Sequence, residues 1–189
     1  EGRVFWEPLL PGIDPAERFR IYDSANETLA RLHTTDYQAI GLGEFGKPGN
    51  YFARQISRWS KQYVASETDK IPEMDKLMEW LPAHIPPGDE VSIVHGDYRL
   101  DNMIFRSDDF TYQLMQWRLP AELFNGMADA DLKALGIPTE EEYVAAYCRR
   151  TGRDGIPDMD FYVSYNMFRL ACILQGIMGR VRDGTAASE

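Results

Sequence analysis

One short segment of the sequence concentrates residue types that perform acid–base and metal chemistry. His95, Asp97 and Asn102 fall within V-H-G-D-Y-R-L-D-N-M, between the apolar runs 91–94 and 103–105. A carboxylate such as Asp97 can accept the proton of a substrate hydroxyl, or orient that hydroxyl toward a reacting phosphate. An amide oxygen such as that of Asn102 can bind Mg²⁺, which prefers oxygen ligands. The segment is therefore a candidate catalytic centre.

The alternative interpretation is a polar turn that only joins two strands, because Asp and Asn are common turn residues. The five-residue step from Asp97 to Asn102 is also the spacing of the protein-kinase catalytic loop. Gly96 lets the backbone turn sharply after the first apolar run, and His95 can fix the loop by hydrogen bonds. The combination of V-H-G-D, this spacing and a following apolar run favours the catalytic interpretation.

Two other groups of residues suggest chemistry less strongly. The glycines of G-L-G-E-F-G-K-P, residues 41–48, match G-x-G-x-x-G, but a phosphate-binding loop needs a preceding strand and a hydroxyl after its Lys. Here a helix is predicted to precede, and Pro48 replaces the hydroxyl, so we expect a plain loop. His33 is predicted to cap a helix end, His84 has no evident partner, and the scattered histidines do not predict a zinc site.

Composition narrows the classes of partner. A net charge of −10 argues against nucleic acid and against an anionic membrane surface, which both need basic residues. No apolar run approaches the length that spans a bilayer and no signal peptide is evident, so we expect a cytoplasmic protein. Cys148 and Cys172 lack metal-ligand spacing and are expected to be buried, reduced thiols.

The pattern of apolar residues predicts a mainly helical α+β chain. Helix starts are clear at Asp14-Pro15-Ala16-Glu17 and at the capping box that begins with Thr139. Further helices are expected over about 51–63 and 74–81, and from Asp158 onward. The runs 91–94 and 103–105 are expected to be short strands, forming a small β element around the polar loop.

The loop H-G-D-Y-R-L-D-N resembles the hallmark H-G-D-x-x-x-x-N of the aminoglycoside phosphotransferase/choline kinase family. The longer form H-G-D-Y-R-L-D-N-M-I-F is similar to the branch of phosphotransferase domains related to those linked to acyl-CoA dehydrogenases. Two further segments support this branch, G-K-P-G-N-Y-F-A-R-Q-I-S-R-W-S-K-Q-Y and G-I-P-T-E-E-E-Y-V-A-A-Y-C-R-R-T-G. The resemblance covers essentially the whole chain.

The resemblance implies a protein-kinase-like fold, with residues 1–189 forming its helical C-lobe. It implies that Asp97 is the catalytic base, that Asn102 is the metal ligand, and that both contact the ATP–Mg²⁺ cofactor. His95 would support the loop as a third catalytic-site residue. Arg99 and Asp101 would position the loop.

Two parts of the family pattern have no counterpart in this chain. Nothing resembles the nucleotide-binding N-lobe, which we expect upstream of residue 1. The family also follows its catalytic loop with a strand and an acidic second metal ligand, whereas Arg106-Ser107-Asp108 here leads directly into Asp109-Phe110. About twenty residues, the length of a strand with its turn, are expected to be missing near 108/109.

The expected function is ATP- and Mg²⁺-dependent phosphorylation of a hydroxyl group on a small molecule, with low activity for a chain that lacks the N-lobe. The alternative is a catalytically inactive, kinase-like binding module, because the second metal ligand is absent. The acidic charge suits a cationic acceptor such as an aminoglycoside or choline, whereas the branch resemblance suggests a hydroxyacyl-CoA. The sequence leaves the oligomeric state and these substrate alternatives open.

Overall fold

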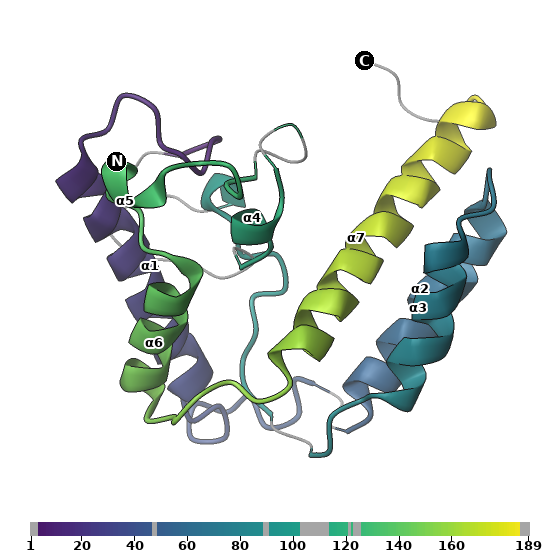
Figure 1. The fold of residues 1–189 in the computed structure, drawn as a ribbon. Coiled ribbons are helices and arrows are strands. Elements are labelled where there is room, and N and C mark those ends of the chain that lie inside the picture. Colours follow the sequence, from purple (N-terminus) through teal and green to yellow (C-terminus); the bar gives the residue numbers. More distant parts are fainter. Residues whose placement is uncertain are drawn as a thin grey trace. The chain divides into compact units, whose positions relative to one another are not determined.

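Helices make up the regular structure of this protein in the computed structural model. The structure describes residues 4–46, 49–88, 91–102, 114–120, 122 and 126–185. The chain divides into two compact units, each built from two separate segments (Figure 1). The first unit comprises Glu1–Gly46 with Val91–Pro157, and the second comprises Lys47–Glu90 with Asp158–Glu189.

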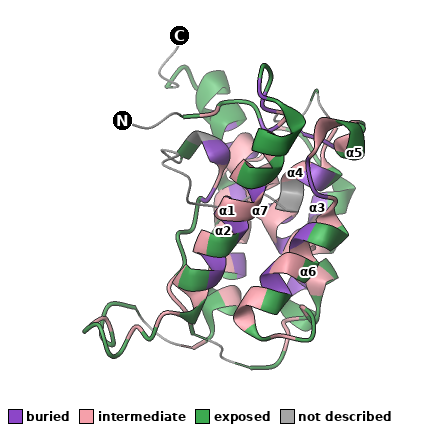
Figure 2. Cartoon of the chain, turned by 90° about the vertical axis from the view of Figure 1, so that its left-hand side faces the viewer, coloured by how far each residue is buried: buried purple, intermediate pink, exposed green. Residues whose placement is uncertain are grey.

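The first unit is built on a pair of helices that are far apart in the sequence. Helix α1 (Pro15–Thr34) packs along α6 (Glu140–Thr151), and the short α5 (Leu132–Leu135) also contacts α1 (Figure 1). The unit also contains the 3₁₀ turn η1 (Leu100–Asn102) and helix α4 (Leu114–Arg118). Buried residues recur on one face of α1 and of α6 (Figure 2). The main core members are Leu10, Tyr22, Ala25, Leu29, Tyr98, Leu100, Trp117, Met127, Ile137 and Tyr143.

The ends of α1 and α6 follow from their sequences, as predicted. The Asp14 carboxylate accepts hydrogen bonds from the first free N–H groups of α1, at 3.0 Å each. Thr139 and Glu142 form a reciprocal capping box at the start of α6. Gly152 ends α6 in the left-handed conformation, with φ of +70°.

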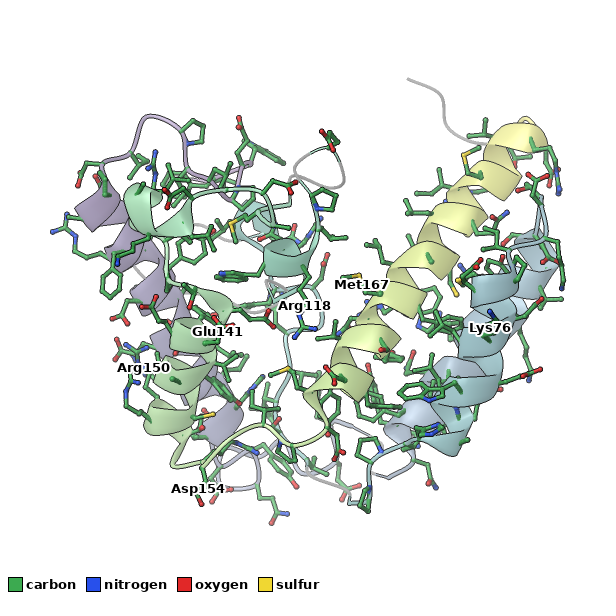
Figure 3. The ribbon with its side chains drawn as sticks, in the orientation of Figure 1. Lys76, Arg118, Glu141, Arg150, Asp154 and Met167 are labelled. Carbon is green, nitrogen blue, oxygen red and sulfur yellow. The ribbon has the colours of Figure 1, made fainter. Side chains whose placement is uncertain are left out.

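A buried polar network fixes α1 against α6. The Asn26 side chain is fully buried and donates to the carbonyl oxygen of Tyr143 at 2.8 Å. Arg150, which Figure 3 labels on α6, donates to Asn26 Oδ1 at 2.9 Å and to Asp23 Oδ1 at 2.7 Å. Because a buried amide is costly when its partners are missing, the network specifies one register between the two helices.

The second unit packs α2 (Tyr51–Ser66), α3 (Pro72–Ala83) and α7 (Met159–Arg182) together. Its core contains Ile56, Tyr63, Met74, Leu81, Phe161, Tyr165, Phe168 and Cys172. Gly179 allows α2 and α7 to approach closely, since a Cβ atom there would lie 3.1 Å from Ser66 Cβ. Gln175 adds a hydrogen bond of 2.6 Å to the carbonyl oxygen of Ser66.

The cysteines behave as expected for core residues. Both Cys148 and Cys172 are free and buried. Burial raises the pKa of the Cys172 thiol to about 12, so the thiol stays protonated at neutral pH and is a poor nucleophile.

One prediction from the sequence, the strand over 91–94, was wrong. Residues 91–95 have no regular secondary structure, and Val91 and Val94 are 42% and 61% exposed. A strand needs a neighbour for its backbone groups, and nothing in the described ranges pairs with this segment. The predicted strand 103–105 lies outside the described residues. His33 lies in the last turn of α1, and its Nδ1 atom lies 2.8 Å from the Tyr147 hydroxyl of α6, so it also bridges two helices.

No helix in the described part of the chain has an apolar stretch long enough to span a bilayer.

The core of the second unit can be tested by shortening Phe168, which is fully buried on α7. We expect Phe168→Ala to lower the free energy of unfolding by about 3–5 kcal/mol, because it removes buried apolar surface and leaves a cavity. Urea unfolding followed by circular dichroism measures this change. Val64→Ala on α2 is the control, since Val64 is 61% exposed and should cost at most about 0.5 kcal/mol. Equal losses for the two variants would contradict the described packing.

Candidate active site

The side chains of Asp97 and Asn102 are in direct contact. Asn102 Nδ2 donates to Asp97 Oδ2 at 2.7 Å and to the Asp97 carbonyl oxygen at 3.0 Å. The turn η1 makes this contact possible, because the Asn102 backbone N–H donates to the Arg99 carbonyl oxygen at 2.9 Å and closes the loop. Both hydrogens of the amide are therefore directed at Asp97, and its oxygen faces away from that carboxylate.

Arg99 contacts the other oxygen of the same carboxylate. Its Nε atom lies 3.4 Å from Asp97 Oδ1. Asn102 and Arg99 thus approach Asp97 from its two oxygens and hold the carboxylate in one orientation. The Asp97 side chain is 55% exposed, so one side of it remains accessible to a ligand.

Two buried side chains anchor the loop to the core of the first unit. Tyr98 and Leu100 are 3% and 2% exposed, and both belong to the core that α1 and α6 form. The Tyr98 hydroxyl donates to the carbonyl oxygen of Ala25 on α1, at 3.4 Å. Alternation along the loop therefore buries Tyr98 and Leu100, leaves Asp97 exposed and leaves Arg99 partly exposed.

His95 and Gly96 shape the entry to the loop. The His95 ring packs edge-on against the Tyr98 ring, with centroids 5.4 Å apart. Gly96 has φ of +85°, in the left-handed region that favours glycine. His95 is exposed, and its described ring contact is with the anchoring Tyr98. The structure thus places His95, Asp97, Arg99 and Asn102 in one loop, with direct contacts of Arg99 and Asn102 to Asp97.

The amide oxygen of Asn102 fits a magnesium ion. It is a hard ligand of the kind that Mg²⁺ takes, usually with bound waters and substrate phosphates. In the described ranges, no group of three or more metal-ligating side chains is found. Asp108 and Asp109, next to which a missing segment is expected, lie outside what the structure describes, as does the side chain of Asp101.

Sequence reasoning did not identify the anchoring role of Tyr98 and Leu100. The signal that could have found it is the alternation Asp97-Tyr98-Arg99-Leu100, in which polar and apolar residues change place at every step. A loop with this pattern has one buried and one exposed side, which is how a rigid core can position exposed catalytic groups.

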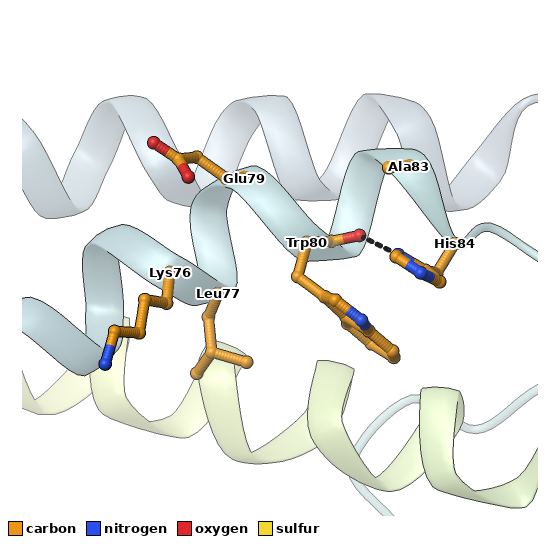
Figure 4. A pocket seen from close by; sticks show the side chains of 6 residues that line it. All are labelled: Lys76, Leu77, Glu79, Trp80, Ala83 and His84. Atoms are coloured by element: carbon orange, nitrogen blue, oxygen red, sulfur yellow. Dashed lines mark hydrogen bonds between the residues drawn. The ribbon is translucent and has the colours of Figure 1, made fainter.

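A recess of about 450 Å³ lies on α3 of the second unit, and none of its lining residues is a predicted catalytic residue. It is lined by Lys76, Leu77, Glu79, Trp80, Ala83 and His84 (Figure 4). The His84 ring stacks on Trp80, with centroids 4.2 Å apart, and His84 Nδ1 lies 2.8 Å from the Trp80 carbonyl oxygen. These contacts give His84 a structural partner.

Comparisons with known proteins support the family that the H-G-D-x-x-x-x-N motif indicates. The sequence model of the phosphotransferase enzyme family matches residues 1–162. The chain is 39% identical to mouse acyl-CoA dehydrogenase family member 10 and 34% identical to human acyl-CoA dehydrogenase family member 11. These alignments cover 99% and 100% of this chain but only 20% and 27% of the relatives, so the chain spans about a quarter or less of their length.

A solved structure is also closely similar. The chain superposes with a TM-score of 0.92 on the crystal structure of a provisionally assigned aminoglycoside phosphotransferase from Ralstonia eutropha, at 51% sequence identity. The superposition covers 100% of this chain and 64% of that protein.

The positive φ of Gly96 gives a test of the loop geometry. Gly96→Ala should lower the free energy of unfolding by about 1 kcal/mol, because a side chain disfavours a φ of +85°. A Cβ atom at Gly96 would meet nothing within 4 Å, so backbone strain is the expected cause. The control is Gly155→Ala, which has open space without a positive φ and should change the unfolding free energy by less than about 0.5 kcal/mol. Thermal and urea unfolding measure both variants, and an unchanged stability for Gly96→Ala would contradict the loop geometry.

Proposed function

The chain belongs to the phosphotransferase enzyme family, and we propose that it transfers the terminal phosphoryl group of ATP to a hydroxyl group of a small molecule. The observation that carries this proposal is the exposed Asp97 carboxylate, held by Asn102 on one oxygen and by Arg99 on the other. The structural similarity supports the kinase-like fold in which such a loop performs phosphoryl transfer.

Asp97 acts on the acceptor hydroxyl. Its carboxylate accepts a hydrogen bond from the hydroxyl, orients the oxygen toward the phosphorus atom, and takes the proton as the new P–O bond forms. Orientation matters because in-line transfer requires the attacking and leaving oxygens to lie on opposite sides of the phosphorus. Asn102 and Arg99 restrict the rotation of the Asp97 carboxylate before the acceptor binds. Less conformational entropy of this side chain is therefore lost on binding.

Asn102 has a second role through its amide oxygen. The two N–H groups are bound to Asp97, which leaves Oδ1 on the opposite side of the amide as a ligand for Mg²⁺. Bound with ATP, Mg²⁺ neutralises charge on the phosphate oxygens. Asn102 thereby couples the position of the base to the position of the metal.

The acceptor we propose is a hydroxyacyl-CoA. Several relatives that cover the whole chain are named acyl-CoA dehydrogenase family members, and this supports a CoA ester over a choline-like acceptor. The name of the Ralstonia protein points instead to an aminoglycoside. A panel of hydroxyacyl-CoA, aminoglycoside and choline acceptors, offered to the intact protein with ATP, separates the three classes.

The remaining parts of the site are proposed to lie outside this chain. The alignment with the mouse relative extends over 209 positions, although this chain has 189 residues. Relatives therefore carry additional residues inside the matched region, which supports a missing segment with the second metal ligand. The nucleotide-binding lobe is proposed to precede residue 1, and the activity described here requires both.

Removal of the proposed base gives the first test. We expect Asp97→Asn in the intact protein to reduce kcat for phosphoryl transfer by about 100- to 10,000-fold, because the amide cannot accept the proton. The matched control is Asp154→Asn, which changes an exposed carboxylate just after α6 (Figure 3) and should leave kcat unchanged. Transfer from radiolabelled ATP measures both rates, and full activity of Asp97→Asn would show that Asp97 is not the base.

Two substitutions separate the roles of Asn102. Asn102→Ala removes both the metal ligand and the donors to Asp97, whereas Asn102→Asp keeps an oxygen ligand and loses the donors. We expect both to lower kcat, and the Mg²⁺ concentration that gives half-maximal rate to rise about tenfold or more only in Asn102→Ala. Titration of the rate with Mg²⁺ checks this. An unchanged Mg²⁺ requirement in Asn102→Ala would exclude Asn102 as a ligand.

A further inference from the structure

Arg99 supplies the permanent positive charge of the candidate active-site loop, since residues 91–102 contain no other Arg or Lys. Its Nε atom lies 3.4 Å from Asp97 Oδ1, and its side chain is 35% exposed. A guanidinium carries five N–H donors in a planar fork, so one such group can contact a carboxylate and a phosphate at the same time. The charge and the shape of this side chain therefore suit a second role beside the orientation of Asp97.

The loop fixes the place of Arg99 relative to the reacting atoms. Its two neighbours in the chain, Tyr98 and Leu100, are 3% and 2% exposed and belong to the core of the first unit. An acceptor hydroxyl that is hydrogen-bonded to Asp97 has its oxygen about 2.7 Å from the carboxylate, with the phosphorus about 3 Å further on. The transferring phosphoryl group then lies within about 6 Å of the carboxylate, a distance that the long side chain beside Asp97 can span.

The proposed reaction moves negative charge from one side of Arg99 to the other. Before transfer, the guanidinium faces the Asp97 carboxylate. During transfer, the acceptor O–H bond breaks and its proton passes to Asp97, while the acceptor oxygen forms the new bond to phosphorus. The bond from phosphorus to the bridging oxygen of ATP breaks, and its electron pair stays on ADP.

This movement makes Arg99 more attractive to the phosphoryl group as the reaction proceeds. Protonation removes the negative charge of Asp97, whereas the three equatorial oxygens of the phosphoryl group carry charge in the transition state. The guanidinium thereby loses a charged partner at the moment when the phosphoryl oxygens need one. An interaction that is stronger in the transition state than in the ground state is one that accelerates the reaction.

We propose that Arg99 contacts the transferring phosphoryl group and stabilises its charge, in addition to orienting Asp97. The proposal rests on the proposed function, because it assigns a further catalytic residue to the same site. It involves side chains of a single loop in the first unit, together with ATP and the acceptor. A planar fork of N–H groups is also the arrangement that binds two oxygens of one phosphate.

A double-mutant cycle separates the phosphoryl contact from the orienting role. A residue that acts only through Asp97 has no further effect once Asp97 is replaced. Transfer from radiolabelled ATP by the intact protein is measured for Arg99→Gln, Asp97→Asn and the double variant. The matched control is Arg118→Gln, because Arg118 (Figure 3) contacts Glu140 at 2.8 Å in the same unit, with its side chain 36% exposed.

We expect Arg99→Gln to lower kcat about 100- to 1,000-fold in otherwise wild-type protein, and still about tenfold or more in the Asp97→Asn background. Arg99→Lys, which keeps the charge and loses the fork, should have an intermediate kcat. Arg118→Gln should stay within about twofold of wild type. Equal kcat values for Asp97→Asn and the double variant would overturn the phosphoryl contact, and so would equal losses in Arg99→Gln and Arg118→Gln.

A binding measurement distinguishes failure of this proposal from failure of the proposed function. ADP with Mg²⁺ and aluminium fluoride imitates the planar phosphoryl group, and titration calorimetry compares its binding with that of ADP and Mg²⁺ alone. We expect aluminium fluoride to strengthen ADP binding about tenfold or more in wild type and in Arg118→Gln, and less than about twofold in Arg99→Gln.

The two measurements together give a different result for each failure. Wild-type protein that shows this Arg99-dependent gain but phosphorylates no acceptor supports the contact and contradicts the proposed function. Wild-type protein that phosphorylates an acceptor, with the same gain in Arg99→Gln as in wild type, overturns the contact and leaves the proposed function standing. The absence of any gain in wild-type protein also overturns the contact.

Discussion

The hydrogen bond from Asn102 to Asp97 is the interaction on which the site depends. It joins the two ends of a six-residue loop at 2.7 Å, and it can form only because η1 turns the chain back on itself. One amide group then serves two purposes, since its nitrogen orients the carboxylate and its oxygen is left for a metal. In a longer loop, or in a loop with a different turn, one amide could not both orient the carboxylate and present its oxygen to a metal. The spacing of the motif is therefore a geometric requirement of the pair.

The loop needs a rigid support because the reacting groups themselves are exposed. Tyr98 and Leu100 provide it by inserting into the core of the first unit. That core depends in turn on the pairing of α1 with α6, which the buried Asn26 and its partners hold in one register. The pairing of α1 with α6 thus supports Tyr98 and Leu100. These two side chains in turn hold the loop that orients the Asp97 carboxylate. The second unit is a separate helical body with its own core.

Local signals in the sequence predicted much of this. The caps at Asp14 and Thr139 act through neighbouring residues, so the starts of α1 and α6 could be read directly. The motif likewise placed Asp97 and Asn102 together, because a five-residue spacing within one loop leaves few arrangements. Long-range features could not be read in the same way. The contact of Asn26 with Tyr143 joins residues that lie 117 positions apart, and the contact of His33 with Tyr147 joins α1 to α6 over 114 positions. The run 91–94 has the composition of a strand, but composition does not supply a neighbouring strand to pair with.

The central claim is that Asp97 and Asn102 form one half of a phosphoryl-transfer site, with the base and the metal linked through a single amide. The most direct measurement is a crystal structure of the intact protein with Mg²⁺, a non-hydrolysable ATP analogue and a hydroxylated acceptor. We predict Asn102 Oδ1 within about 2.1 Å of Mg²⁺, Nδ2 still bound to Asp97, and the acceptor hydroxyl in contact with the Asp97 carboxylate. A complex in which the nucleotide and its metal bind elsewhere, with Asp97 and Asn102 contacting neither metal nor acceptor, would contradict the claim.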